Sequence, residues 1–174
     1  MKKNLLLLAI ILPVACFCQK DTIPKNADGK YEYTEVVNVD SSDAASLYSK
    51  AKMFIVSAFK SGKDVTQLND DNSKTVIGKG VTPVSIKIII GPPVSSYVGF
   101  TISIQCKNNR YRYLINDFIL DDISTKRRLD DTYWQKSRSR KKMLDQIQHQ
   151  IYEDMTAFVT ELKKDMSSHT AKDW

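Results

Sequence analysis

Cysteine and histidine, which supply metal ligands and catalytic groups in many proteins, are scarce in this sequence. Its 174 residues include three cysteines and two histidines. Cys16 and Cys18 lie in an N-terminal apolar segment, so Cys106 stands alone in the rest of the chain. We therefore expect no internal disulfide. We also expect Cys106 to fill space in a strand, because a free cysteine packs as a small hydrophobic residue.

The common motifs of metal and catalytic sites are also absent from the sequence. His149 and His169 have no partner at metal-ligand spacing, and no H-E-x-x-H, C-x-x-C or G-x-S-x-G pattern occurs. Paired acids occur at 70–71, 121–122 and 130–131, where adjacent carboxylates are usually solvated rather than facing each other across a sugar. The sequence thus predicts no cofactor, no metal and no enzymatic activity, with a hydrolase as the least favoured alternative.

An apolar run behind two lysines opens the chain. Lys2 and Lys3 precede uninterrupted apolar residues at 5–14, and small residues follow as far as Cys18. This run is too short to span a bilayer core, which takes about 20 helical residues. The pattern is typical of a secretory signal. We expect residues 1–18 to be a signal peptide, and the rest of the chain to be periplasmic or secreted.

Two processing routes are open for this segment. Cleavage between Cys18 and Gln19 places small residues at the positions that signal peptidase reads. Acylation of Cys16 would instead anchor the protein to a membrane. Pro13 stands where a lipoprotein signal usually has an aliphatic residue, so cleavage is favoured and the lipid anchor at Cys16 is the alternative.

Positive charge is concentrated in one segment, residues 126–142. The whole chain has a formal net charge of +6, and in this segment only Asp130 and Asp131 oppose the cations. The basic residues are Lys126, Arg127, Arg128, Lys136, Arg138, Arg140, Lys141 and Lys142. The remainder is close to balanced, which is not the pattern of a protein that coats nucleic acid, and we expect no nucleic-acid partner.

The first half of the chain predicts a leader, a strand and a helix. Residues 19–30 are polar and indicate a flexible leader, and residues 31–39 alternate as a strand does, although Glu35 interrupts the apolar face. Asp40-Ser41-Ser42-Asp43 indicates a helix start, because Ser and Asp oxygens can accept from the first N–H groups of a helix, and this helix is expected to end near Ser61-Gly62. Its apolar stripe comprises Ala44, Leu47, Tyr48, Ala51, Ile55, Ala58 and Phe59.

From Val65 to Leu120, apolar and polar residues alternate with a period of two, which indicates the strands of a sheet. A turn is expected at 69–73. Gly78 and Gly80 lie inside one strand, where glycines often mark a bulge or a close backbone approach. The expected strands are residues 65–68, 75–81, 85–90, 98–106 and 110–120.

The last two of these strands predict a hairpin in detail. Asn108 and Asn109 can form its turn, because asparagine tolerates a positive φ. A two-residue turn pairs Cys106 with Tyr111, Ile104 with Tyr113, and Ile102 with Ile115 on one face, and Gln105 with Arg112 and Thr101 with Asn116 on the other. One face is therefore apolar and the other polar, as in a sheet that is covered on one side.

A long amphipathic helix is expected at residues 143–166, followed by a tail at 167–174. Its apolar residues are Leu144, Ile147, Ile151, Met155, Phe158, Leu162 and Met166. At about 1.5 Å per residue this helix spans about 35 Å, enough to lie across a sheet. The sequence thus predicts one α+β domain over residues 31–166 with an antiparallel sheet in the order β-α-β-β-β-β-α, which counts one strand fewer than the segments given above.

Three local features accompany this order: Tyr31-Glu32-Tyr33-Thr34-Glu35-Val36-Val37, Ile77-Gly78-Lys79-Gly80 and Asn109-Arg110-Tyr111-Arg112-Tyr113. Together with the element order, these three features resemble a domain-of-unknown-function family of exported proteins from Gram-negative bacteria. That family is described as having a TATA-binding-protein-like (TBP-like) fold. The resemblance covers residues 31–120. It implies the fold and an envelope location, and it implies no activity and no functional residues.

Two surfaces remain as candidates for function. The first is the polar sheet face, where we expect an unidentified protein partner or small ligand to bind. Its residues are Tyr97, Thr101, Ser103, Gln105, Arg110 and Arg112. The alternative is peripheral membrane association through the basic segment, with its aromatic and cationic residues at the lipid interface. Its residues are Trp134, Arg138, Arg140, Lys141 and Lys142.

Overall fold

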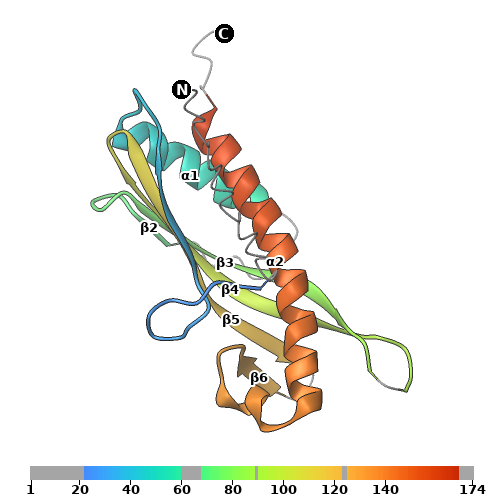
Figure 1. The fold of residues 1–174 in the computed structure, drawn as a ribbon. Coiled ribbons are helices and arrows are strands. Elements are labelled where there is room, and N and C mark those ends of the chain that lie inside the picture. Colours follow the sequence, from blue (N-terminus) through green and yellow to red (C-terminus); the bar gives the residue numbers. More distant parts are fainter. Residues whose placement is uncertain (1–21, 60–67, 89, 123–124, 169–174) are drawn as a thin grey trace, which may run out of the picture.

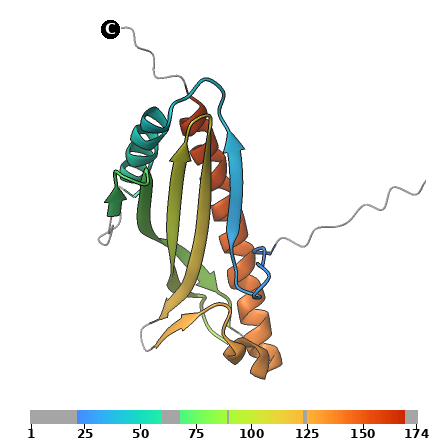
Figure 2. The same ribbon diagram turned by 90° about the vertical axis from the view of Figure 1, so that its left-hand side faces the viewer.

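The computed structural model describes residues 22–59, 68–88, 90–122 and 125–168. Six strands form one antiparallel sheet, and two α-helices lie on the same face of it (Figure 1, Figure 2). The elements in chain order are β1 (Tyr33–Asn38), α1 (Ala44–Ala58), β2 (Leu68–Asp70), β3 (Thr75–Ile86), β4 (Val94–Lys107), β5 (Arg110–Asp122), β6 (Thr125–Arg128), the 3₁₀ helix η1 (Thr132–Lys136) and α2 (Arg138–Ser167). The predicted α+β class is confirmed.

The β4–β5 hairpin forms in the predicted register. Its pairs are Cys106 with Tyr111, Ile104 with Tyr113, Ile102 with Ile115, Gln105 with Arg112, and Thr101 with Asn116. Asn109 takes a φ of 61° in the turn. Cys106 is buried, and burial raises the pKa of its thiol to about 12, which agrees with a space-filling role.

The hairpin turn is fastened to the start of α1. The side-chain oxygen of Asn108 accepts a hydrogen bond from the backbone N–H of Ala44 at 2.9 Å, and Asn109 N–H donates to the carbonyl of Ser42 at 2.7 Å. Asp43, the last residue of the predicted start signal at 40–43, caps the helix by accepting from the N–H of Ser46 at 2.8 Å. The turn and the helix start thus hold each other in place.

The strand order is β1-β5-β4-β3-β2, with β6 also beside β5. β3 is a single strand, although the sequence indicated two. Pro83 does not interrupt it, because β2 does not extend along that part of β3. The backbone N–H that proline lacks is therefore not needed for a hydrogen bond between strands. The predicted turn at 69–73 is wrong for Asn69 and Asp70, which belong to β2. β6 adds a strand to the predicted order. The predicted end of the first helix at Gly62, and residues 65–67, lie outside the described residues.

The two strand glycines mark a close approach, as the sequence suggested. A Cβ on Gly80 would lie 2.2 Å from the Phe59 ring, and one on Gly78 would lie 3.0 Å from Ile55. α1 therefore packs directly onto β3. The bulge of the sheet falls instead on β5, where Asp117, with a φ of 57°, and Phe118 together face Phe100.

α2 packs along the sheet as predicted. It begins at Arg138, earlier than expected, with Ser137 as its N-cap. At its other end, the buried Lys50 of α1 donates from its ammonium group to the carbonyl of Met166 at 3.3 Å. No helix in the described part of the chain is long and apolar enough to cross a membrane. The buried apolar residues of α2 are Leu144, Ile147, Ile151, Met155, Leu162 and Met166.

The described part of the predicted leader is folded against the domain. Ile23 is 3 % exposed, and the side-chain oxygen of Asn26 accepts from the N–H groups of Asp28 and Lys30 at 3.0 Å. The backbone N–H of Glu32 donates to the carbonyl of Pro24 at 2.9 Å. The prediction of a flexible leader is therefore wrong for residues 22–30, because Ile23 has a buried site to fill.

Candidate functional site: a cationic hollow on the outer sheet face

The face of the sheet opposite α1 and α2, here called the outer face, is not covered by a helix in the described part of the chain (Figure 2). Side chains on it are half-buried or exposed, in alternation with the buried residues of the inner face. Val36, Val81 and Tyr97 are each more than half exposed, at 55 %, 56 % and 55 %. The outer face is thus a mixed polar and apolar surface.

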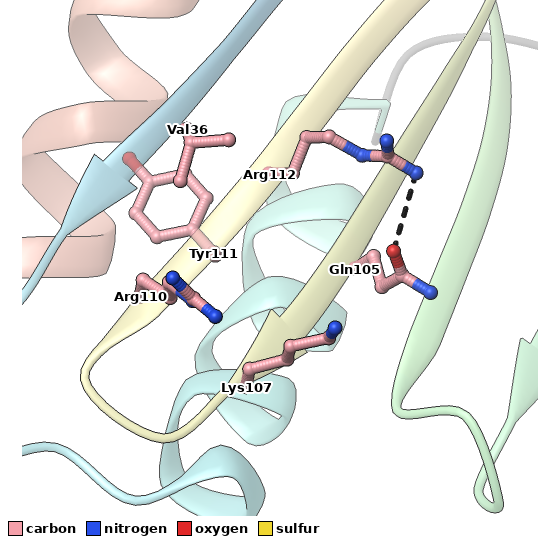
Figure 3. A pocket seen from close by; sticks show the side chains of 6 residues that line it. All are labelled: Val36, Gln105, Lys107, Arg110, Tyr111 and Arg112. Atoms are coloured by element: carbon pink, nitrogen blue, oxygen red, sulfur yellow. Dashed lines mark hydrogen bonds between the residues drawn. The ribbon is translucent and has the colours of Figure 1, made fainter.

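Three cations line an open hollow on this face next to the β4–β5 turn (Figure 3). Lys107 and Arg110 are directly paired across the hairpin, and Arg112 has Gln105 on one side and Val36 of β1 on the other. This register brings side chains from three strands to one place. The hollow has a volume of about 220 Å³ and is lined by Val36, Gln105, Lys107, Arg110, Tyr111 and Arg112.

The charges of this hollow have no counter-ion among the described residues. Arg112 donates from its guanidinium group to the neutral side chain of Gln105 at 3.2 Å (Figure 3). Lys107 and Arg110 form no ion pair within the described part of the chain. The site therefore has three exposed cations beside one exposed aliphatic side chain, Val36.

This arrangement suits recognition of an anion. A guanidinium group presents two parallel N–H donors that match a carboxylate or phosphate, and a lysine adds a mobile point charge. The neighbouring Val36 provides apolar contact for a ligand that carries such a group. No group of three or more His, Cys, Asp or Glu side chains in the described ranges could hold a metal ion.

The structure divides the predicted sheet-face residues. Gln105, Arg110 and Arg112 come together in the hollow, whereas Thr101 and Ser103 are half-buried further along β4. Tyr97 lies eight residues before Gln105 on the same strand, which is about 26 Å away at 3.3 Å per residue. The six residues therefore do not form one site.

Three residues that line the hollow, Val36, Lys107 and Tyr111, were not among the predicted sheet-face residues. The sequence placed Tyr111 on the apolar face, and the structure buries its ring. Lys107 continues the outward alternation of Thr101, Ser103 and Gln105, so the sequence held a signal for it. Val36 enters the hollow only because β1 pairs with β5, a contact between segments about 75 residues apart, for which the sequence pattern holds no signal.

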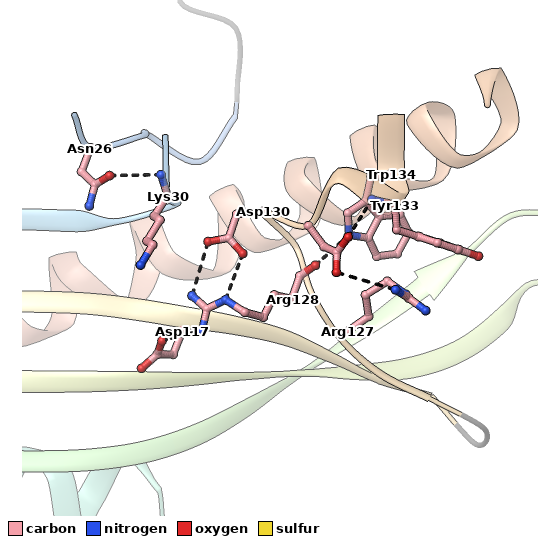
Figure 4. A network of polar contacts seen from close by, with 9 residues as sticks. Asn26, Lys30, Asp117, Arg127, Arg128, Asp130, Tyr133 and Trp134 are labelled. Carbon is pink, nitrogen blue, oxygen red and sulfur yellow. Dashed lines mark hydrogen bonds and ion pairs between the residues drawn. The ribbon is translucent and has the colours of Figure 1, made fainter. Parts of the chain in front are cut away.

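Four of the eight basic residues in segment 126–142 have acidic or aromatic partners, some of which are drawn in Figure 4. Arg128 forms ion pairs with Asp117 at 2.9 Å and with Asp130 at 3.0 Å, and both contacts raise the pKa of its guanidinium group. Trp134 is 1 % exposed, and its indole N–H donates to the carbonyl of Arg128 at 2.8 Å. The prediction that Trp134 lies at a lipid interface is therefore wrong for this structure, because the ring fills the core.

Tyr133, beside that tryptophan, binds two further cations of the segment. The guanidinium groups of Arg127 and Arg140 lie 3.8 Å and 4.0 Å from the centre of its ring. Lys126 pairs with Asp121 at 2.9 Å. The basic residues of the segment without a side-chain partner among the described residues are Lys136, Arg138, Lys141 and Lys142.

Comparison with known proteins agrees with this architecture. The family described as "Domain of unknown function (DUF4468) with TBP-like fold" matches residues 33–120. The chain belongs to this family. The resemblance seen in the sequence is thereby confirmed for the family and the fold. No curated protein sequence matches the chain.

Two solved structures are similar in fold over most of the chain. A DUF4468 family protein from Bacteroides ovatus is similar with a TM-score of 0.64 and 13 % identity, over 87 % of this chain and 94 % of its own. A TBP-like protein from Parabacteroides distasonis gives a TM-score of 0.63 and 12 % identity, over 84 % of this chain and 97 % of its own. These likenesses extend beyond residues 33–120 and concern the fold alone, so function must be argued from the site.

Proposed function

We propose that this chain is a non-catalytic domain of the cell envelope that binds an anionic group of a protein partner or small ligand in the cationic hollow. The observation that carries the proposal is the cluster of Lys107, Arg110 and Arg112 without a counter-ion among the described residues. Some other cations near the sheet do have carboxylate partners, as Lys163 has Glu35 at 2.6 Å and Lys126 has Asp121 at 2.9 Å.

Electrostatics favours an anion at this place. Like charges on neighbouring strands repel each other, and a bound carboxylate or phosphate would offset that repulsion while accepting several hydrogen bonds. The hollow opens to solvent, where charges are strongly screened. Binding should therefore weaken steeply as the salt concentration rises.

The envelope location rests on the N-terminal pattern of Lys2, Lys3 and the apolar run at 5–14. Protein isolated from its native host should begin near Gln19, or at an acylated Cys16. Mass spectrometry of the mature N-terminus tests this part of the proposal. An intact Met1 would contradict export.

Binding itself can be tested with simple anionic probes. Inorganic phosphate and a short poly-glutamate peptide represent phosphate and carboxylate ligands, respectively, and poly-glutamine is the neutral control. We expect the wild type to bind at least one anionic probe at low salt, and Arg110→Glu with Arg112→Glu to abolish binding. Lys79→Glu with Lys164→Glu removes two exposed cations elsewhere and should leave binding within about twofold. Equal losses in both double variants would contradict a defined site.

A further inference from the structure

The turn between β3 and β4 projects from one end of the molecule (Figure 1). Apolar side chains on this turn are exposed to solvent. Ile88, Ile90 and Val94 are 48 %, 87 % and 40 % exposed, and Pro92 and Pro93 are exposed between them. Single exposed aliphatic residues are ordinary on protein surfaces. Several exposed aliphatic residues close together on one projecting turn are unusual, and such an apolar patch indicates an interaction site. We call these five residues the apolar tip.

The base of the apolar tip is fastened to α2. The side-chain oxygen of Gln146 accepts from the N–H of Lys87 at 3.0 Å, and its amide group donates to the carbonyl of the same residue at 3.5 Å. One helical turn later, Gln150 makes the same pair of contacts with Ser85, at 2.8 Å and 2.9 Å. These side chains take the place of a neighbouring strand at the edge of the sheet.

The same contacts bring the free cations of α2 close to the apolar tip. The amide group of Gln146 also donates to the carbonyl of Lys142 at 3.4 Å, so Lys142 lies one turn from the base of the tip. Arg138 and Lys141 share that first part of α2, and the first turn contains no acidic residue. Lys87, Arg138, Lys141 and Lys142 have no carboxylate partner among the described residues.

We propose that this end of the molecule docks on an anionic phospholipid surface. Ile90 and Val94 insert among the acyl chains near the headgroups, and the four cations contact lipid phosphates. A convex aliphatic tip flanked by lysine and arginine is complementary to an anionic bilayer surface, which is apolar within and negative outside. A groove for a helix or strand of a protein partner would be concave.

This docking surface is separate from the cationic hollow. The hollow lies next to Lys107 at one end of β4, and the apolar tip includes Val94 at the other, about 40 Å away at 3.3 Å per residue. Neither proposal depends on the other. Variants at the two ends can therefore serve as controls for each other.

Vesicle flotation tests the apolar part of the proposal. The probes are vesicles of phosphatidylcholine with about 30 % phosphatidylglycerol, and vesicles of phosphatidylcholine alone. We expect the full chain to float with the anionic vesicles, and Ile90→Ser with Val94→Ser to weaken binding by about tenfold or more. Met53→Ser with Val56→Ser replaces two exposed apolar residues of α1 and should leave binding unchanged. Equal binding by the tip variant and the wild type would overturn the proposal.

Charge reversal tests the cationic part. Replacing Arg138, Lys141 and Lys142 with glutamate should reduce the affinity for anionic vesicles by about a hundredfold. Each cation near an anionic membrane surface raises the affinity by about fivefold. Replacing Lys107, Arg110 and Arg112 with glutamate changes the net charge equally at the hollow and should reduce binding much less. If the two triple variants lose binding equally, attraction by overall charge explains it and the proposed surface is wrong.

Insertion can be located directly, independently of the N-terminal apolar segment. Ile90→Trp keeps a large apolar side chain at the tip, so it should bind as the wild type does. The emission that the new tryptophan adds to that of the wild type should shift to shorter wavelength when the protein binds anionic vesicles. Brominated acyl chains should quench this emission. Thermal melts monitored by circular dichroism must show each variant folded. Emission that neither shifts nor is quenched in bound protein would overturn insertion of the tip.

Discussion

The ring of Phe59 occupies the space directly above Gly80. Any side chain at position 80 would place its Cβ 2.2 Å from that ring and 2.9 Å from Phe100. Phe59 and Phe100 are themselves held by further rings, Phe158 among them, at centroid distances of 5.9 Å and 5.8 Å. The absence of a side chain on β3 therefore sets how closely α1 approaches the sheet.

Gly80→Ala should destabilise the domain by about 1–3 kcal/mol, because the new methyl group must displace packed aromatic rings. Gly99→Ala, on the neighbouring strand, is the matched control. A Cβ there would have its nearest neighbour at 3.8 Å. Chemical denaturation of both variants measures the difference. A Gly80→Ala protein as stable as the wild type would show that α1 does not press on β3 as described.

Glu35, which interrupts the apolar face of β1, has partners that explain its position. Lys163 of α2 pairs with its carboxylate at 2.6 Å, and the hydroxyl of Tyr113 donates to it at 2.8 Å. These contacts, Lys163 first, hold the pKa of Glu35 below its usual value. The carboxylate is partly exposed, so the ion pair is worth about 1 kcal/mol or less.

A lowered native pKa means that ionised Glu35 stabilises the fold. The advantage of the wild type over Glu35→Gln should be complete above the ordinary glutamate pKa of 4.5, and it should fade as the pH falls through the lower native pKa. Unfolding free energies of both proteins from neutral to acidic pH give this curve. The exposed Glu161→Gln on α2 is the control. A difference that grows towards acid would contradict the ion pair.

Trp134 anchors the charged segment, so its removal should cost far more than a surface substitution. Trp134→Ala should destabilise the fold by about 3–5 kcal/mol, because a large buried ring is lost. Trp134→Phe keeps most of the ring but loses the hydrogen bond to the Arg128 carbonyl, which should cost about 1 kcal/mol more than the volume change alone. Equilibrium denaturation measures both. If Trp134→Ala melts as the wild type does, the residue is not part of the core.

The C-terminal helix should be required for folding. Ile147, Ile151, Leu162 and other α2 residues are fully buried against the sheet and α1, and each contributes about 1.5–3 kcal/mol before entropy is subtracted. A chain that ends after Lys142 should therefore be insoluble or lack a cooperative thermal transition. A truncated chain that is monomeric and unfolds cooperatively would show that α2 is an appendage.

The parts of the fold that follow from local pattern were predictable from the sequence. The two-residue turn at Asn108 and Asn109 fixes the register of the β4–β5 hairpin, and alternation then assigns every side chain to a face. The helix start near residues 40–43 follows from the capping oxygens of the Asp and Ser side chains there. The position of β1 beside β5 was not predictable, because it depends on contacts between distant segments.

The charged segment shows a second reason for failure. β6 and η1 form because Arg128 finds Asp117 on a bulge of β5, and because Trp134 finds a place in the core. Neither contact follows from the local sequence pattern, so the charge of the segment by itself suggested membrane association. For the hollow, alternation identified Gln105, Arg110 and Arg112, whereas the place of Val36 had to come from the tertiary structure.

The most direct test of the anion-binding proposal is a residue-resolved nuclear magnetic resonance titration with the poly-glutamate peptide and with inorganic phosphate. Saturable shifts should fall on the backbone amides of Val36, Gln105, Lys107, Arg110 and Arg112 and on the side-chain N–H groups of the two arginines. The shifts should vanish in the Arg110→Glu, Arg112→Glu protein, whose remaining spectrum should match that of the wild type. Shifts scattered over the lysines of the whole surface, or confined to residues 138–142, would contradict the proposed site.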